Sequence, residues 1–318
     1  MRTLGARLLQ GQVSTVVTWA LLAVAITVNA ALQPTFFTLY SITSNFATFA
    51  PLVLVTIAQA VVVIGGGLDL SLGATVALSS VVAITVMDGR PGMVPLGFLT
   101  AIGVGALCGL FNGVVVSVVR LQPLIATFAS SSIFGGLALT VMPKPGGTVP
   151  SPMTQAYRMA IAGLPVSVLV VLLSVGAWLL LRQTKLMRHI YAVGGDAAAA
   201  YASQVPVVSV RIWSYVIAGV FSGLAAMAVL ANSGSGDPFV GASLALNSIA
   251  AVVVGGIALS GGKGGAVGAA VGAIVLAMSA NVIFFLNVPT TYRELANGLV
   301  IIGALALSVL SSRKGARR

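Results

Sequence analysis

The fold of this chain is decided by residues 46–87, which read FATFAPLVLVTIAQAVVVIGGGLDLSLGATVALSSVVAITVM. Two uncharged, apolar runs, 46–64 and 71–87, flank a short glycine-rich link that carries one carboxylate, Asp69. Each run approaches the length of about 20 apolar residues that a helix needs to cross the hydrocarbon core of a bilayer. The stretch therefore predicts two membrane-spanning helices joined by an irregular, polar link.

Composition extends this prediction to the whole chain. Hydrophobic residues make up 58% of the 318 residues, and charged residues make up 7%. Because a soluble domain carries about a quarter charged residues, this chain has too few charges to cover a water-facing surface. We therefore expect an all-α integral membrane protein, a polytopic bundle of helices, with the lipid bilayer as its surroundings.

Apolar runs recur from one end of the chain to the other. The first follows Arg2 and Arg7 and is long enough to be a retained helix rather than a cleaved signal peptide. No segment is long and polar enough to form a second domain, so we expect residues 1–318 to be one transmembrane domain. About ten spans are predicted, at 13–32, 46–64, 71–87, 94–119, 124–142, 165–181, 212–231, 244–260, 265–286 and 294–311.

The positive charges indicate how these spans are oriented. The formal charge is +11, but the basic residues lie in short connections rather than in a patch that would bind nucleic acid. If the N-terminus is cytoplasmic and the spans alternate, the basic residues outside are Arg90, Lys144, Arg158 and Arg293, and all others are inside. Positive charge is enriched in cytoplasmic loops, so both termini are predicted to be cytoplasmic.

Few residues could carry chemistry. Cys108 and His189 are the single cysteine and histidine, and with five acidic residues they cannot easily assemble a metal site. Only Asp69 comes near a span, so the carboxylates of a proton or ion relay are lacking. Gly261–Gly265 reads GGKGG and lacks the Ser or Thr and the spacing of a phosphate-binding loop. We expect no catalytic residue, no metal and no cofactor, and any energy for transport must come from another subunit.

Two connections differ from the others. The external segment from Pro143 to Leu164 is rich in proline and glycine, which opposes a regular helix and predicts a shaped loop. The segment 182–211 is the longest cytoplasmic connection, and there Asp196 precedes the alanine run Ala197–Ala200. An Asp before helix-forming residues is typical of a helix N-cap, so we expect a short cytoplasmic helix at this point.

Glycines recur at four-residue spacing, which places them on one face of a helix and lets two helices approach closely. We expect these faces to pack inside the bundle, with a translocation path as the alternative. Residues 62–71 and 253–260 also resemble each other, which would suit either an internal repeat or a coincidence between two glycine-rich stretches. The spaced glycines are Gly105, Gly109 and Gly113, then Gly219 and Gly223, then Gly264, Gly268 and Gly272.

Four motifs together resemble those of the ribose-type sugar permeases, which are membrane subunits of bacterial ABC importers. Residues 65–73, GGGLDLSLG, are similar to the family signature GGIDLSVG. GLFNG at 109–113, followed by PLIAT at 123–127, matches the next family motif. YAVGGD at 191–196 resembles YAVGGN, and IAAVVVGGIALSGG at 249–262 resembles IAAVVIGGTSLSGG. The likeness covers nearly the whole chain, in order.

This resemblance implies a permease of the bacterial inner membrane with several partners. Two permease copies pair on ATP-binding subunits, and a periplasmic sugar-binding protein delivers the solute. The short helix expected after Asp196 would be the coupling helix that docks on the ATP-binding subunit. The resemblance thus assigns ATPase coupling to Gly194, Gly195, Asp196, Ala198 and Ala199, and a translocation path or structural motif to Gly66, Gly67, Asp69, Ser71, Asn112 and Thr127.

The chain departs from the family pattern at three places. Asp196 stands where asparagine is usual, and Gln204 lies near a usual glycine. The segment ALNS at 245–248 replaces the common ELDA, so two carboxylates are absent. A hypothesis follows that this permease pairs either with itself or with a related permease that keeps those acids.

Other functions stay open at the level of the sequence. A permease for branched-chain amino acids or nucleosides shares the distant architecture, and a passive channel or a membrane scaffold would be a different class. The resemblance implies a monosaccharide or similar neutral polyol as the solute, and the scarcity of charge within the spans agrees with a neutral substrate. For Asp69 itself, the alternatives are a capping role at the start of the next helix and a direct role in the path.

Overall fold

A computed structural model describes residues 2–289, together with 291–292, 295–296, 298–299 and 302–303. Side chains are described from Val16 onward. The expected last span, 294–311, lies outside the described residues for the most part.

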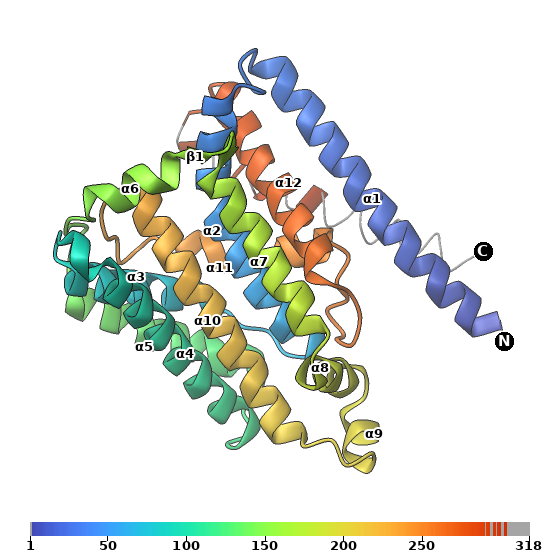
Figure 1. Ribbon diagram of the computed structural model, residues 1–318. Helices are drawn as coiled ribbons and strands as arrows, with labels where there is room; N and C mark the ends of the chain where they lie inside the picture. Colours follow the sequence, from blue (N-terminus) through green and yellow to red (C-terminus); the bar gives the residue numbers. More distant parts are fainter. Residues whose placement is uncertain (1, 290, 293–294, 297, 300–301, 304–318) are drawn as a thin grey trace.

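Within the described part the chain is almost wholly helical, as expected (Figure 1). The elements are α1 (Arg2–Leu32), α2 (Leu39–Ile64), α3 (Leu72–Met87), the 3₁₀ turn η1 (Pro91–Met93), α4 (Val94–Ser117), α5 (Pro123–Val141), α6 (Ser151–Arg158), β1 (Ala160–Ile161), β2 (Leu164–Pro165), α7 (Val166–Arg182), α8 (Lys185–Gly195), α9 (Ala197–Ala202), α10 (Val207–Ser233), α11 (Ala242–Val254) and α12 (Ala266–Phe285).

Each of the first nine expected spans falls on a helix, but the helices differ in length. The described part holds 5 helices that are long and apolar enough to cross a membrane. These are α2, α4 with η1, α5, α10 and α12, and the number becomes 6 if α7 and α8, bent by 80°, form one span. The described parts of α1, α3 and α11 are shorter apolar helices. An all-α membrane fold is therefore present.

Two expected helix boundaries differ from the structure at glycines. The span predicted at 244–260 ends at Val254, because Gly256 adopts a φ of +81° that closes the helix. Gly264 was predicted to stack on one helix face with Gly268 and Gly272. It instead lies in the turn before α12 with a φ of +111°, so the stacking holds for the other two glycines alone.

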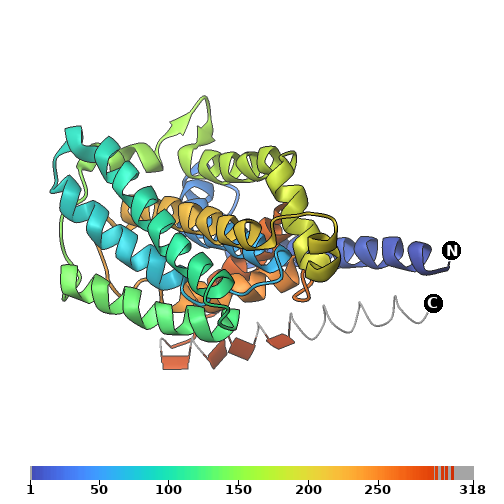
Figure 2. The ribbon, with the colours of Figure 1, turned by 90° about the horizontal axis from the view of Figure 1, so that it is seen from below.

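Helix α2 is the centre of the bundle. Its residues from Ala47 to Ile64 are nearly all buried, which agrees with the absence of charged residues from this helix. Helices α7, α10, α11 and α12 surround it, and α4 packs along α10 (Figure 1). Seen from below, α4 and α5 form an outer layer on one side, while α1 extends away from the bundle toward its N-terminus (Figure 2).

The crossing of α4 and α10 depends on facing glycines. A Cβ atom on Gly105 would overlap the carbonyl oxygen of Gly219, and one on Gly219 would overlap that of Gly105. Likewise, a Cβ on Gly109 would overlap the carbonyl of Tyr215. Because lipid is as apolar as the helix surfaces, the hydrophobic effect does not drive two helices together inside the membrane. Close approach of this kind stabilises the helix pair through van der Waals contact instead. The α11–α12 pair repeats the arrangement at Gly255 and Gly268.

Helix α1 is held by polar contacts to helices far away in the sequence. The Thr18 hydroxyl donates to the Val254 carbonyl over 2.7 Å, and the buried Asn29 amide donates to the Met278 carbonyl over 3.2 Å. A further amide pair, Asn281 to Asn45 at 3.0 Å, joins α12 to α2. These bonds attach α1 to α11 and α12, and α2 to α12.

The loop 143–164 contains a regular helix, which the sequence argument did not expect. Helix α6 forms because Pro150 and Pro152 occupy its N-cap and first turn, where a missing N–H does no harm. The Tyr157 hydroxyl donates to the Ala47 carbonyl over 3.1 Å, and the Arg158 guanidinium donates to the Asn232 carbonyl over 3.0 Å. Helix α6 thereby closes what we call the α6 end of the bundle.

Replacing Gly109 with Ala should destabilise the protein by about 1–3 kcal/mol, because the new methyl group forces α4 and α10 apart. Thermal unfolding in detergent, followed by tryptophan fluorescence, would measure the drop in the transition midpoint. Gly103→Ala is the control, since a Cβ at that position of the same helix meets nothing within 4 Å. Equal midpoints for both variants would contradict the close crossing.

Candidate functional site

The link between α2 and α3 begins with a glycine-closed helix end. The Gly65 N–H donates to the Val61 carbonyl at 3.1 Å, and the Gly67 N–H donates to the Val62 carbonyl at 3.0 Å. Gly66 between them has a φ of +81°, a conformation that side chains disfavour. A Cβ on Gly67 would lie 2.7 Å from the Tyr215 hydroxyl. The chain thus leaves α2 sharply and close against α10.

Asp69 lies in this link and is buried, with 1% of its surface exposed. Its Oδ1 accepts hydrogen bonds from the Ser71 N–H at 2.8 Å and from the Ser71 hydroxyl at 2.7 Å. The Asn112 amide of α4 donates to the Ser71 Oγ at 2.6 Å and lies 3.4 Å from Asp69 Oδ2. Ser71 is the N-cap position of α3, and Asn112 belongs to α4. The Asp69 carboxylate therefore joins the link to the start of α3 and to Asn112 of α4.

Side chains from other helices satisfy the backbone of the link. When the Gln59 amide of α2 is oriented so that both of its groups find partners, it donates to the Asp69 carbonyl at 2.9 Å and accepts from the Asp69 N–H at 3.3 Å. Thr127 Oγ1 of α5 accepts from the Leu70 N–H at 3.1 Å, and the Tyr215 hydroxyl of α10 donates to the Leu68 carbonyl at 3.4 Å. Irregular backbone among membrane helices is stable only when it is satisfied in this way.

Gln59 and Tyr215 were not singled out in the sequence, although both contact the link. A signal for Gln59 was present, since it is an uncharged polar residue within an otherwise apolar stretch of α2. Such a residue must find a partner inside the protein. Tyr215 gave no signal, because an aromatic residue in an apolar span is ordinary.

The short helix expected after Asp196 is confirmed. Helix α9 covers Ala197–Ala202, and Asp196 Oδ1 accepts from the N–H groups of Ala198 at 2.9 Å and Ala199 at 3.0 Å. Substituting Asp196 for the asparagine that is usual in the family keeps this cap, because both residue types accept such bonds. Tyr201, at the far side of α9, is 76% exposed.

Helix α8, which precedes α9, was not predicted. Thr184 caps it by accepting from the Met187 N–H at 3.2 Å, and Met187, Ile190 and Val193 face the bundle and are buried. The periodic spacing of these apolar residues after a Thr could have revealed the helix. Helix α8 turns away from α7 by 80° and carries α9 at the end of the bundle opposite α6, which we call the α9 end.

Three sequence motifs meet at the α9 end. Gly194 of α8 lies directly against the Ile64 carbonyl, which also accepts from the Gly262 N–H at 2.9 Å. The Tyr191 hydroxyl of α8 donates to the Gly264 carbonyl at 2.6 Å. Partial burial raises the pKa of this phenol above its usual value, which keeps the hydroxyl protonated to a higher pH than in an exposed tyrosine. Asp69, Ser71, Asn112 and Thr127 gather in the neighbouring cluster around the link.

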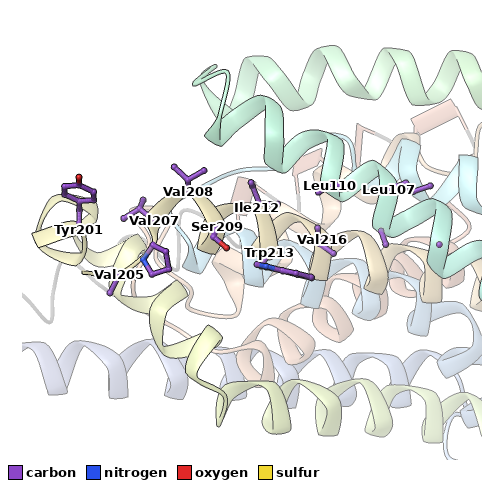
Figure 3. A pocket seen from close by; sticks show the side chains of 13 residues that line it. Leu107, Leu110, Tyr201, Val205, Val207, Val208, Ser209, Ile212, Trp213 and Val216 are labelled. Atoms are coloured by element: carbon purple, nitrogen blue, oxygen red, sulfur yellow. The ribbon is translucent and has the colours of Figure 1, made fainter. Parts of the chain in front are cut away.

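The hollow surfaces of the described part are mostly apolar. A groove of about 840 Å³ lies between α4 and α10, with Tyr201 of α9 at one end (Figure 3). Its walls are formed by residues such as Leu107, Leu110 and Trp213. A second groove of about 1210 Å³ runs between α7 and α10 and is equally apolar. No cluster of metal-ligating side chains occurs among the described residues.

Comparison with known proteins places the chain in a family. The model of the branched-chain amino acid transport system / permease component family matches residues 41–305. The chain belongs to this permease family. It is therefore a multi-pass transport permease of the bacterial inner membrane rather than an enzyme. The match includes the link, the grooved helices and the α8–α9 segment described above.

Individual relatives cover most of the chain. It is 33% identical over 259 residues to the ribose import permease protein of Bacillus subtilis strain 168, covering 80% of each chain. The ribose import permease protein of Escherichia coli K12 is 30% identical over 292 residues, which is 89% of this chain and 90% of the relative. The D-allose transport system permease protein of E. coli K12 is 29% identical over 299 residues, or 93% and 92%. No solved structure gives a significant match.

Asp69→Ala should lower the stability of the permease by about 1–3 kcal/mol, because the buried Ser71 N–H and the Ser71 hydroxyl lose their acceptor. Thermal unfolding in detergent would record the change. Asp88→Asn is the control, because Asn tolerates the left-handed φ of +46° at this position and the contact of the 75% exposed Asp88 side chain with Arg90 at 3.7 Å contributes little. A loss of stability no larger than that of the control would contradict the structural role of Asp69.

Proposed function

We propose that this protein is the membrane-spanning subunit of a binding-protein-dependent ABC importer that carries a monosaccharide or similar neutral polyol inward. The observation that carries the proposal is helix α9, which stands exposed beyond the bundle at the position of the family's cytoplasmic motif. A short capped helix on a bent arm is suited to receive a rigid-body displacement from a partner. The family relationship supports the same reading.

A partner must supply the energy. Lacking a phosphate-binding loop, the chain depends on a separate ATP-binding subunit, which docks on α9 and its surroundings. Ala198, Ala199 and Tyr201 are exposed on α9, and Arg182, Lys185 and Arg188 are exposed on the arm that leads to it. Together they offer a docking surface of apolar groups flanked by positive charge.

We propose that α9 lies on the cytoplasmic side. In our proposal the chain crosses the membrane ten times, with both termini in the cytoplasm. Contacts between connections support this arrangement. The connections predicted to be cytoplasmic contact one another at one end of the bundle, and those predicted to be external contact one another at the other end. The links after α2, α8 and α11 gather at the α9 end, whereas 143–150, α6 and the end of α10 gather at the α6 end.

The α6 end is then the docking surface for the periplasmic binding protein. A polar hollow of about 280 Å³ lies there, lined by α6 residues Thr154, Gln155 and Arg158 and by Asn232 to Gly234 of α10. Polar and positively charged groups at this place could contact carboxylates and hydroxyls of the incoming protein. The structured loop that holds α6 keeps them at fixed positions.

The path for the solute forms between two permease copies. Both larger grooves in the described part are apolar, and a sugar requires hydrogen-bonding groups along its route. Pairing with a second copy, or with a related permease that keeps the acids missing near Ala245 and Asn247, would complete such a path. Purification of a tagged copy together with an untagged copy distinguishes the homodimer from the heterodimer.

Deletion of Ala197–Ala200 should abolish ATP-driven uptake while the protein still reaches the membrane, because the partner loses its docking helix. Uptake of radiolabelled D-ribose by vesicles that contain the permease, its ATP-binding subunit and its binding protein would measure this. A passive channel has no need of α9, so unchanged flux in the deleted protein would refute the importer.

The solute class is tested by competition in the same vesicles. D-ribose uptake should be saturable and should fall when D-allose competes for the binding protein, whereas L-leucine should have no effect. The relatives' names favour a sugar, and the family description leaves a branched-chain amino acid as the alternative. Uptake of L-leucine without uptake of either sugar would favour that alternative.

A further inference from the structure

Three chain segments that lie far apart in the sequence cross at one point without side chains between them. We call this point the glycine junction and define it by Gly66, Gly194, Gly261, Gly262 and the carbonyl of Ile64. A Cβ on Gly261 would come within 2.5 Å of the Gly194 carbonyl and 2.9 Å of the Gly66 Cα. A Cβ on Gly262 would lie 2.6 Å from the Gly195 Cα.

The geometry demands glycine for two separate reasons. Gly66, Gly261 and Gly262 have φ values of +81°, +84° and +69°, where residues with a side chain are strained. Gly194, in contrast, is helical, and space is its constraint: a Cβ there would overlap the Ile64 carbonyl and lie 2.9 Å from the Gly262 nitrogen. The family motifs are therefore glycine-rich here because backbone meets backbone.

The two loops that flank Gly194 have the same local structure. After α2, the N–H groups of Gly65, Gly66 and Gly67 bond to the carbonyls of Val61, Val63 and Val62. After α11, the N–H groups of Gly255, Gly256 and Ile257 bond to those of Ala251, Val253 and Val252 in the same order. The likeness between 62–71 and 253–260 thus corresponds to a shared helix ending, and α8 inserts its glycine between the two.

We propose that Gly194 is a positioning residue that fixes α8 and α9 to the ends of α2 and α11, so that a displacement of α9 moves both loops as one unit. This inference rests on the proposed function, in which α9 receives movement from the ATP-binding subunit. Backbone-to-backbone contact leaves no flexible side chain to absorb the displacement. The Ile64 carbonyl bond to Gly262 and the Tyr191 bond to Gly264 hold the same three segments.

The junction leads directly to the buried polar cluster. From Gly66 the link runs through Leu68, whose carbonyl is bound by Tyr215 of α10, to Asp69, which is bound to Ser71 and Asn112. A movement of the junction is therefore passed to α3, α4 and α10. On the other side, the loop that contains Gly262 leads into α12. One glycine contact thus reaches most of the central helices.

Gly194→Ala and Gly176→Ala form the pair for the test. Gly176 lies in α7, the helix that leads to α8, and a Cβ on Gly176 meets nothing within 4 Å. Each variant is reconstituted in proteoliposomes with the ATP-binding subunit and the binding protein, and D-ribose uptake and ATP hydrolysis are measured together. We expect Gly194→Ala to transport at least about fivefold less sugar per ATP, the lower range of a typical coupling between sites. Gly176→Ala should match the wild type.

The ratio separates positioning from a loss of folded protein. A merely destabilised variant would lower uptake and ATP hydrolysis in proportion, leaving sugar per ATP unchanged, and that result would overturn the proposal. So would an unchanged ratio at full activity. Failure of the wild-type permease to assemble with any ATP-binding subunit would instead refute the proposed function. The role of Gly194 at the junction would then be tested by a second measurement, which needs no partner protein.

That measurement is the distance between two spin labels in the permease alone, in lipid nanodiscs. Cys108 is the sole cysteine, so Cys108→Ala with Ser203→Cys and Ser260→Cys labels the end of α9 and the loop after α11, both exposed. We expect one narrow distance distribution in this background and with Gly176→Ala, and a broader or shifted one with Gly194→Ala. A broad distribution in the background protein, or equal distributions in all three, would overturn the junction.

Discussion

The structure depends on one constraint, which is that backbone groups inside a membrane bundle must find partners within the protein. The link between α2 and α3 is the place where this is hardest, because seven residues, 65–71, separate the two helices. Gln59, Thr127 and Tyr215 supply the missing hydrogen bonds from three different helices. The link is consequently tied to α2, α5 and α10 at once, and its conformation cannot change without moving them.

Glycine serves two different purposes in this protein. Along α4, α10 and α12 it lets helices approach, because lipid offers no hydrophobic drive for their association. Around Gly194 it lets loops and a helix cross backbone to backbone, which is a matter of connection rather than of packing in lipid. The sequence motifs mix both uses, and only their three-dimensional placement separates them.

The positions of the helices could be predicted from the sequence to a large degree, since apolar runs of membrane length have few other interpretations. Helix α9 was predictable for a local reason: Asp196 caps an alanine run, and no distant contact is required. The meeting of Gly66, Gly194 and Gly262 was not, because contacts between segments up to two hundred residues apart leave no local pattern. Helix α8 and the early end of α11 were missed because short helices and glycine closures are weak signals beside long apolar runs.

The bonds that hold α1 also bear on how the protein is made. Thr18 and Asn29 emerge from the ribosome among the first residues, yet their partners Val254 and Met278 are synthesised more than two hundred residues later. At about 5–20 residues per second, the first helix waits on the order of 10–50 s for them. During this time the Asn29 amide has the Ala25 carbonyl of its own helix, 2.8 Å away, but not its second acceptor on α12. Biogenesis of the permease therefore passes through an interval in which its first helix is inserted but not yet assembled.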